Sequence, residues 1–584
     1  MDSSTEGLEG GESYPRPIQG VERVGFFRRS VWHNAGFGSL RHIRTHIGSV
    51  EPRFVPTVYP HDLPRLPSGP DEAADPAPTG SDPTNEEDCA LNPTLAHCSV
   101  AQFRKAYLSG DLTPLAVVKA LLPLIRRDVS PPGIHSTAWI DVKVDLVLQA
   151  AEASTLRYRN KQSLGPLDGV LAAVKDQFDV KGYMTPMGSP HDFTGCDHGK
   201  MYTSWCVQKL QEAGAIIVGK LNMHEFAADT SGINTTYGTP RNPYNKGHYT
   251  GGSSSGSAYA VAAGLVPIAL GTDGGGSIRI PASFCAVYGL KPSHDRLSYL
   301  PGANHNITCE VNGPIAIDMG SLATVYSVIS QPHPASAFPP APSLREMLPL
   351  NSTPRVLGIP EAWFDRAEPA VQKLCRSMID WLVKNKGYTV VPIEIPFLAE
   401  GEAAHALTVL SHSATTVPEE TRASPAVRIM LALGRETGAG DYLLAQKLRR
   451  VLMQHLAWLW RERHPGMLVV TPTTAGAGWP ILDPVWEMAR GLSDGRRSLQ
   501  TMEYVWLANF CGMPSLSVPA GYVVPPEGGG RVPVGLMATA EWTREDLLMR
   551  FGCDAEEVVD ERYKRPEGWV DLLRAAQGVH LEGP

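Results

Sequence analysis

Short apolar runs alternate with amphipathic stretches along most of this chain, starting near Ser99. The clearest helical spacing follows Thr113-Pro114, a helix N-cap with proline in the first turn. Apolar residues recur behind it on one helical face, at Leu115, Val118, Leu121, Leu122 and Ile125. Short continuous apolar runs such as Leu171–Val174 are instead typical of buried strands.

Helix and strand patterns follow one another in turn toward the end of the chain. Alternation of this kind is typical of an α/β fold in which helices cover both faces of a sheet. We therefore predict one large α/β domain over residues 96–584, with a mixed, mostly parallel central sheet. The predicted helices are 99–110, 113–125, 142–159, 202–213, 278–285, 369–386, 440–463 and 499–511, and the predicted strands are 171–174, 216–218, 265–271, 286–290, 356–359, 388–394, 467–471, 515–518 and 533–538.

The first 95 residues differ from this pattern and are predicted to form an N-terminal extension. Residues 1–21 have little to bury and are expected to be a disordered start. In 22–59, aromatic and arginine residues are interleaved. This mixture favours a strap packed on the main domain over an arm that binds a membrane surface or a partner. Residues 60–87 are rich in proline and acidic residues, as in a linker.

Composition limits the function classes. Of the 584 residues, 43% are hydrophobic, and the formal net charge of −8 argues against nucleic acid as a partner. No apolar run reaches the roughly 18 residues that a transmembrane segment needs, and the acidic start does not resemble a secretory or transit leader. Nine cysteines without a Cys-x-x-Cys pair fit reduced thiols, so we expect a cytoplasmic protein.

Two glycine-rich turns carry the candidate chemistry. Gly251–Ser257 precedes an apolar helix pattern, and Gly274–Ser277 follows the strand predicted at 265–271. Backbone N–H groups of Gly274, Gly275 and Gly276 can converge on one point, as the oxyanion hole beside a nucleophilic Ser277 would require. A plain glycine turn capped by serine explains the same residues, because short glycine motifs are weak signals.

A serine nucleophile needs a base. No Gly-x-Ser-x-Gly elbow surrounds Ser277, and no HExxH spacing for a zinc site occurs in the chain. Lys175, at the end of the predicted strand 171–174, is the remaining candidate. Its pKa would have to fall from about 10.4 to near 7, which burial can bring about. The spacing alone is explained better by an ordinary surface lysine at a strand end than by a catalytic base.

Three segments of the chain resemble the signature of the amidase signature family. They are Gly251-Gly252-Ser253-Ser254-x-Gly256-Ser257, Gly271-Thr272-Asp273-x-Gly275-Gly276-Ser277-Ile278-Arg279-x-Pro281-Ala282-x-Phe284-Cys285 and Gly289-Leu290-Lys291-Pro292. Ser277 follows Ser253 by 24 residues, as in the family pattern. Val174-Lys175-Asp176 also resembles a family motif, and the likeness covers residues 95–555. The family includes fatty acid amide hydrolase, bacterial amidases and the glutaminase-like subunit of the tRNA amidotransferase.

The resemblance implies a role for each matching residue. Ser277 matches the nucleophile, Lys175 the base, and Ser253 a serine, held by a cis peptide, that relays a proton between them. Gly274, Gly275 and Gly276 match the oxyanion hole, and the supporting positions are Ser254, Thr272, Asp273 and Arg279. The implied reaction is hydrolysis of a linear amide other than a peptide bond, in a small-molecule substrate, through an acyl-enzyme. We expect neither a metal nor a cofactor.

Departures from the family pattern leave the substrate open. Ser255 replaces a usual glycine, and 315–318 lacks the usual arginine-serine continuation. The alternatives are the glutamine-hydrolysing subunit of a tRNA amidotransferase, a carbamate or ester hydrolase of the same family, and an inactive binding protein. The long extension and the altered 315–318 weigh against the tRNA amidotransferase. The sequence also permits a homodimer.

Overall fold

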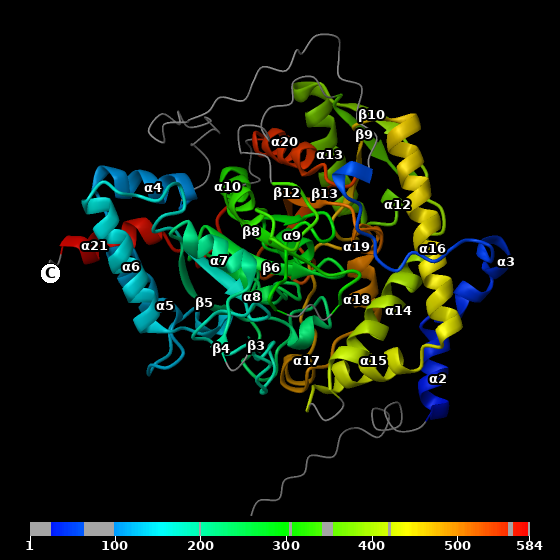
Figure 1. Cartoon of the computed structure of the whole chain (residues 1–584), viewed down its shortest axis with the longest axis horizontal. Coiled ribbons are helices and arrows are strands. Elements are labelled where there is room, and N and C mark those ends of the chain that lie inside the picture. Colours follow the sequence, from blue (N-terminus) through cyan, green and yellow to red (C-terminus); the bar gives the residue numbers. More distant parts are fainter. Residues whose placement is uncertain are drawn as a thin grey trace, which may run out of the picture.

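An 11-stranded sheet runs through the protein and is surrounded by helices (Figure 1). The computed structural model describes residues 25–62, 98–197, 200–302, 306–340, 354–418, 422–558 and 564–581. Across the sheet the strands follow the order β1-β5-β2-β6-β8-β7-β12-β13-β11-β9-β10. The prediction of one large α/β domain with a mixed central sheet is confirmed.

Parallel strands form two separate blocks of this sheet. β2 lies between β5 and β6 and is parallel to both, and β9 lies between β11 and β10 and is parallel to both. The other neighbouring strands of this sheet are antiparallel. The mostly parallel pairing expected from the sequence is therefore limited to these blocks. In the middle, β8 pairs with β6 and β7, and β12 pairs with the strand that follows it, so the chain direction alternates.

The strands agree with most of the predicted positions, and β1, β8 and the pair β3 and β4 are additions to them. They are β1 Trp139–Asp141, β2 Leu171–Lys175, β5 Ile216–Leu221, β6 Ile268–Asp273, β7 Tyr288–Lys291, β8 Val311–Ala316, β9 Val356–Ile359, β10 Thr389–Pro392, β11 Leu468–Pro472, β12 Ser515–Val523 and β13 Val532–Thr539, with a separate pair β3 Cys196–Asp197 and β4 Lys200–Met201.

Helix starts follow the caps read from the sequence. Ser99 Oγ accepts a hydrogen bond from Gln102 N, and Thr113 Oγ1 accepts one from Ala116 N. The helices before residue 330 are α2 Gly25–Asn34, α3 Arg44–Ile47, α4 Val100–Ser109, α5 Pro114–Ile125, α6 Val144–Arg159, α7 Trp205–Glu212, α8 Ser255–Ala262, α9 Arg279–Phe284 and α10 Met319–Ile329, with short 3-10 turns at Phe37–Arg41, Pro60–Asp62, Ser136–Ala138 and Glu225–Ala227.

The second half of the chain supplies more helices than the sequence predicted. They are α12 Glu361–Phe364, α13 Pro369–Lys386, α14 Leu398–Thr416, α15 Pro425–Arg435, α16 Ala439–Trp458 with a π-helical end at Leu459–Arg463, α17 Pro484–Arg490, α18 Gly495–Met502, α19 Trp506–Cys511, α20 Glu545–Glu556 and α21 Leu572–Leu581. The single helix predicted at 499–511 is wrong, because α18 and α19 are separated by three residues at 503–505.

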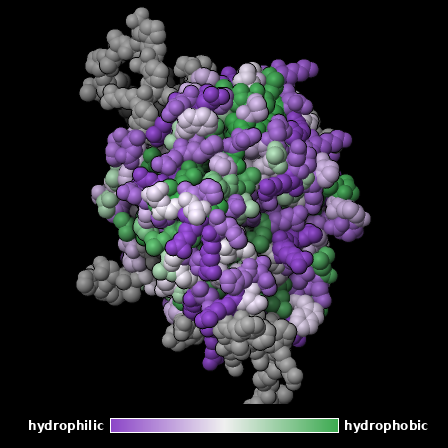
Figure 2. All heavy atoms as spheres, turned by 90° about the vertical axis from the view of Figure 1, so that its right-hand side faces the viewer, coloured by the Kyte–Doolittle hydropathy of each residue, from purple (hydrophilic) through white to green (hydrophobic). Residues whose placement is uncertain are grey.

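Residues 25–62 lie against α14, α15 and α16. Trp32 and Phe37 are buried in the main core, and the Arg41 guanidinium binds the Asp441 carboxylate at 2.8 and 2.7 Å. On the face of the molecule that these elements share, hydrophilic and apolar residues are interspersed (Figure 2). The predicted disordered start at 1–21, and all but the first residues of the predicted linker at 60–87, lie outside the described residues.

Candidate active site

The candidate site lies where two parallel neighbours of the sheet end. β2 ends at Lys175, and β6 ends at Asp273. Because Val174 pairs with Leu270, the carboxyl ends of the two strands meet at one edge of the sheet. Open α/β sheets bind ligands at this edge, so its position supports a functional role.

Lys175 is fully buried at this edge. Its Nζ donates hydrogen bonds to Ser253 Oγ and to Thr272 Oγ1, each at 2.7 Å. Burial lowers the pKa of Lys175 well below its usual value, and the negative charges of Glu310 and Asp273 offset only part of this effect. The amine is therefore available in its neutral form at a lower pH than an exposed lysine.

Ser253 is held by the backbone around it. The Gly252–Ser253 peptide is cis, as the resemblance implied, and the Ser253 carbonyl accepts a hydrogen bond from His224 N at 3.0 Å. A Cβ on Gly252 would lie 2.6 Å from Gly232 N, so only glycine fits before Ser253. Next along the chain, Ser254 N donates to the Ser277 carbonyl at 3.2 Å, and this bond ties the two glycine turns together.

The second turn presents backbone donors beside Ser277, which is 6% exposed. Among the described residues, the N–H groups of Gly274, Gly275 and Ser277 have no hydrogen-bond acceptor. Gly276 differs from the prediction, because its N–H donates to Asp273 Oδ1 at 2.7 Å instead of remaining unbonded. Its φ of +98° makes it the residue at which the chain turns toward Ser277.

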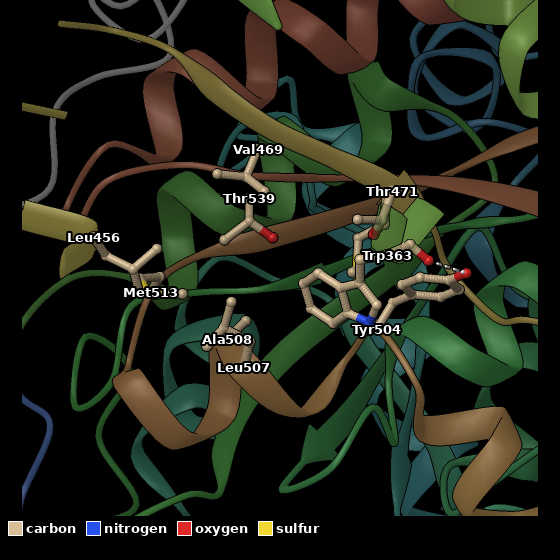
Figure 3. A pocket seen from close by; sticks show the side chains of 10 residues that line it. Trp363, Leu456, Val469, Thr471, Tyr504, Leu507, Ala508, Met513 and Thr539 are labelled. Carbon is tan, nitrogen blue, oxygen red and sulfur yellow. Dashed lines mark hydrogen bonds between the residues drawn. The ribbon is translucent and has the colours of Figure 1, made fainter. Parts of the chain in front are cut away.

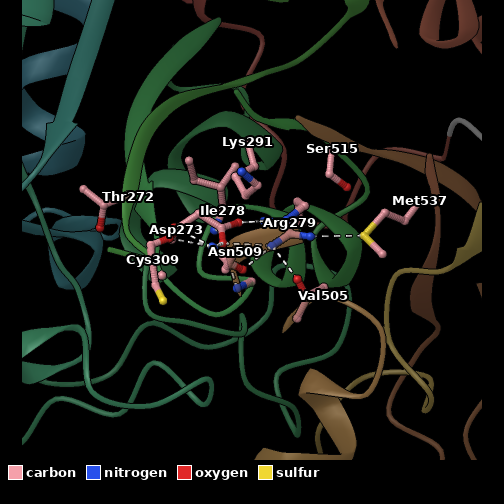
Figure 4. A network of polar contacts seen from close by, with 12 residues as sticks. Thr272, Asp273, Ile278, Arg279, Lys291, Cys309, Val505, Asn509, Ser515 and Met537 are labelled. Carbon is pink, nitrogen blue, oxygen red and sulfur yellow. Dashed lines mark hydrogen bonds and ion pairs between the residues drawn. The ribbon is translucent and has the colours of Figure 1, made fainter. Parts of the chain in front are cut away.

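A buried polar network supports this turn from behind (Figure 4). The Asp273 carboxylate accepts from Ile278 N and from Arg279 Nε and Nη2, at 3.1, 3.0 and 3.0 Å. Asn509 Nδ2 donates to the same carboxylate at 2.9 Å, and Arg279 Nη2 also donates to Asn509 Oδ1. Burial alone would raise the pKa of Asp273, but the Arg279 charge and these hydrogen bonds hold it well below its usual range.

Four residues of the site were missed by the sequence analysis. Gln177 and Glu310 extend the hydrogen bonds of Thr272, and Asn509 belongs to the network around Asp273. His405, on α14, lies against the glycine turn, and its Nε2 is 2.8 Å from the Gly274 carbonyl oxygen. Burial lowers the pKa of His405 to about 4, so the neutral ring donates through Nε2. Asn509 lies in the helix predicted at 499–511, and the other three lie outside every predicted helix and strand.

A small apolar cavity lies beyond this network, between β11, β13 and α19 (Figure 3). Met537 lines the cavity, and its sulfur accepts a hydrogen bond from Arg279 Nη1 at 3.4 Å. The other lining residues are Trp363, Leu456, Val469, Thr471, Tyr504, Leu507, Ala508, Met513 and Thr539. The cavity therefore lies behind the glycine turn and is not lined by Lys175, Ser253 or Ser277.

The described ranges contain neither a cluster of metal-binding side chains nor a membrane-spanning helix. Within them, no group of three or more histidine, cysteine, aspartate or glutamate side chains could hold a metal ion. Nor does any helix in that part of the chain combine the length and the apolar character that crossing a membrane requires.

Comparison with known proteins assigns the family. The model of the Amidase family matches residues 134–549. Fatty acid amide hydrolase of Medicago truncatula is 32% identical over 497 residues, covering 82% of this chain and 80% of that protein. A glutamyl-tRNA(Gln) amidotransferase subunit of Chloroflexus aggregans is 30% identical, covering 82% and 99%. A solved structure described as an amidase has a TM-score of 0.67 at 25% identity, covering 79% of this chain and 100% of its own.

The chain belongs to the Amidase family, and the resemblance read from its signature segments is confirmed. It is an amidase-signature hydrolase of carbon–nitrogen bonds.

Proposed function

We propose that this protein hydrolyses linear amides with Ser277 as nucleophile, Ser253 as proton relay and Lys175 as general base. The observation that carries the proposal is the 2.7 Å hydrogen bond between the buried Lys175 Nζ and Ser253 Oγ. It lies beside the turn in which the N–H groups of Gly274, Gly275 and Ser277 have no acceptor among the described residues.

The reaction begins when neutral Lys175 takes the proton of Ser253 as Ser253 takes that of Ser277. The Ser277 oxygen then attacks the amide carbonyl carbon, and the N–H groups of Gly274, Gly275 and Ser277 stabilise the oxyanion. The relay returns the proton to the leaving amine, whose C–N bond breaks to give an acyl-enzyme. Water activated by the same relay then releases the acid and restores Ser277.

For the substrate, we favour N-acyl amides with an apolar acyl chain. Support comes from the four plant fatty acid amide hydrolases that are 30% to 32% identical over 82% to 85% of this chain. Glutamine hydrolysis within a tRNA amidotransferase is the second candidate, because the amidotransferase relatives are similar along 97% to 99% of their own length. An enzyme of the first kind acts alone, whereas an amidotransferase component needs its partners.

For the cellular setting, we favour the cytoplasm. The cysteines described with side chains are free thiols, as in a reducing compartment. Fractionation of cells that express the tagged protein tests this location, and recovery in a secreted or organellar fraction would contradict it.

The test uses the purified full chain without partners, a series of N-acyl amides of increasing chain length, and glutamine. We expect amine release from the acyl amides, and a loss on the order of a thousandfold or more in kcat/KM for Ser277→Ala and Lys175→Ala. Ser330→Ala is the matched control, since the Ser330 hydroxyl is buried at the end of α10, outside the site. Hydrolysis by Ser277→Ala at the wild-type rate would refute the proposal, and activity on glutamine alone would favour the second candidate.

A further inference from the structure

A chain of hydrogen bonds continues from Lys175 on the side away from Ser253. Lys175 Nζ donates to Thr272 Oγ1 at 2.7 Å, and Thr272 Oγ1 donates to Gln177 Oε1 at 2.8 Å. Gln177 Nε2 in turn donates to Glu310 Oε1. Lys175, Thr272 and Glu310 are 0%, 2% and 5% exposed, so the chain runs through the interior and ends on a buried acid.

The strands around the site bring these residues together. Lys175 ends β2, Thr272 lies near the end of β6, and Glu310 directly precedes β8. β8 pairs antiparallel with β6, with Asp273 opposite Val311, so Glu310 lies beside the start of the glycine turn. A Cβ built on Gly274 would lie 3.6 Å from Glu310 Cβ, in agreement with this placement.

Glu310, at the end of these hydrogen bonds, determines which group donates and which accepts at each step. Burial raises the pKa of Glu310 to about 7, and the Lys175 charge and the hydrogen bonds with Gln177 and Thr272 oppose this shift. The ionised carboxylate only accepts, so Gln177 turns its amide NH2 to Glu310 and its amide oxygen to Thr272. A hydroxyl has a single hydrogen, and that of Thr272 is engaged by the Gln177 oxygen. Thr272 can therefore only accept from Lys175.

This polarity bears on where the lone pair of Lys175 points. The protonated amine donates to both Ser253 and Thr272. When it loses the proton directed at Ser253 and keeps the one directed at Thr272, its lone pair faces the hydroxyl of Ser253. If the Thr272 hydrogen were free to rotate, it could donate to Lys175 and compete with Ser253 for that lone pair.

We infer that Glu310, acting through Gln177 and Thr272, is a positioning residue that keeps the Lys175 lone pair directed at Ser253. The inference rests on the proposed role of Lys175 as general base. It assigns a task to Thr272, which touches the base alone, and to Gln177 and Glu310, which act through Thr272.

Thr272 gives the first test. Thr272→Val keeps the shape of the side chain but removes the hydroxyl, and we expect kcat for amide hydrolysis to fall about tenfold to a hundredfold while KM changes less than about twofold. Thr272→Ser keeps the hydroxyl and should recover most of the loss. Equal activity of the Val and Ser variants would overturn the inference.

Glu310 gives the second test through a double-mutant cycle. Glu310→Gln no longer fixes the orientation of Gln177, so kcat should fall about tenfold, and no further loss should follow in the Thr272→Val background. The acid limb of the pH–rate profile should also move to lower pH, since the charge of Glu310 that favours protonated Lys175 is removed, leaving Asp273 as the charge that faces the amine. Glu402→Gln removes another buried carboxyl, on α14, and should leave the profile unchanged.

Additive losses in the cycle would show that Glu310 acts independently of Thr272 and would overturn the inference. Where circular dichroism shows that Glu310→Gln does not fold, Gln177→Met at a partly exposed position replaces it in the cycle with the same expectation. The two proposals fail differently. An inactive wild-type chain counts against the proposed function, whereas active wild type, inactive Ser277→Ala and unaffected Thr272→Val count against this inference alone.

Discussion

Replacing Asp273 with asparagine tests the network that holds the glycine turn. Asp273 and Arg279 are both fully buried. The carboxylate accepts from Gly276 N, Asn509 Nδ2 and Arg279 Nη2 through Oδ1, and from Ile278 N, Arg279 N and Arg279 Nε through Oδ2. An asparagine at this position can keep the hydrogen bonds that are accepted at Oδ1. Its NH2 group would then face three donors at the position of Oδ2, Ile278 N and Arg279 N and Nε, with no acceptor for any of them.

The size of the effect follows from these contacts. Breaking a buried ion pair by removing one partner costs about 3–5 kcal/mol, because the remaining charge is left uncompensated. The three hydrogen bonds lost at Oδ2, one of them to a charged donor, account for a similar sum of about 3–6 kcal/mol. We therefore expect Asp273→Asn to lower the free energy of unfolding at pH 7 by about 3–5 kcal/mol.

The pH dependence of this loss gives the prediction its sign. The pKa of Asp273 is lower in the folded protein than in the unfolded chain, so its contribution is complete above the unfolded value of about 3.9 and declines as the pH falls below it. Urea unfolding followed by tryptophan fluorescence at pH 7 and at pH 3.5 measures the difference between wild type and variant. We expect a smaller difference at the lower pH.

The matched control is Asp168→Asn. Asp168 is also fully buried and binds Arg157 at 2.5 Å, but it precedes β2, whereas Lys175 ends it. This variant should lose stability and keep its kcat, while Asp273→Asn should lose both. An Asp273→Asn variant within about 1 kcal/mol of wild type at pH 7, or one whose deficit grows as the pH falls, would refute the reasoning.

Three further predictions concern the turn and its base. Gly276→Ala should lower the free energy of unfolding by more than about 2 kcal/mol and abolish activity, because the new Cβ would lie 2.5 Å from Val505 Cγ2. Gly274→Ala should unfold like wild type, since the nearest neighbour of its Cβ is 3.6 Å away. Equal melting temperatures of the two variants would contradict this prediction. His405→Phe removes the donor to the Gly274 carbonyl and should lower kcat about tenfold, with recovery in His405→Gln; identical kcat values in the two variants would count against it. Burial lowers the pKa of Lys175, so kcat/KM should rise with pH to a plateau reached well below the 10.5 of a free lysine, and an acid limb centred at or above pH 10 would contradict the assignment.

Local patterns were sufficient where an element is defined by its own residues. The strand at 356–359 and the helix at 369–386 lie where the sequence placed them, because apolar spacing and end signals agree there. The break at 503–505 has no such signal. It accompanies a contact with a residue more than 200 positions away, in which the Val505 carbonyl accepts from Arg279 Nη2.

β8 shows the same limit for the sheet. It contains Asn312-Gly313-Pro314, residues with low strand propensity, and it is stabilised by pairing with β6 and β7 on either side. Such pairing depends on the tertiary arrangement and leaves no periodic pattern in the segment itself.

The residues of the candidate site also differ in whether the sequence could predict them. Lys175, Ser253 and Ser277 lie in segments that resemble a family signature, and the structure places Lys175 in contact with Ser253. Glu310 and His405 come from segments outside that signature and reach the site through single side chains. Only the folded arrangement of β8 and α14 reveals them.

The N-terminal segment has a consequence for the order in which the protein can be assembled. Arg53 N donates to the Gln446 carbonyl, and the buried Arg449 donates to the Phe54 carbonyl, so residues 25–62 depend on α16 for their place. A ribosome releases α16 long after it has released residues 25–62, and domains generally fold as units once their parts are available. The earliest part of the nascent chain must therefore wait for the late helices, and docks among the last.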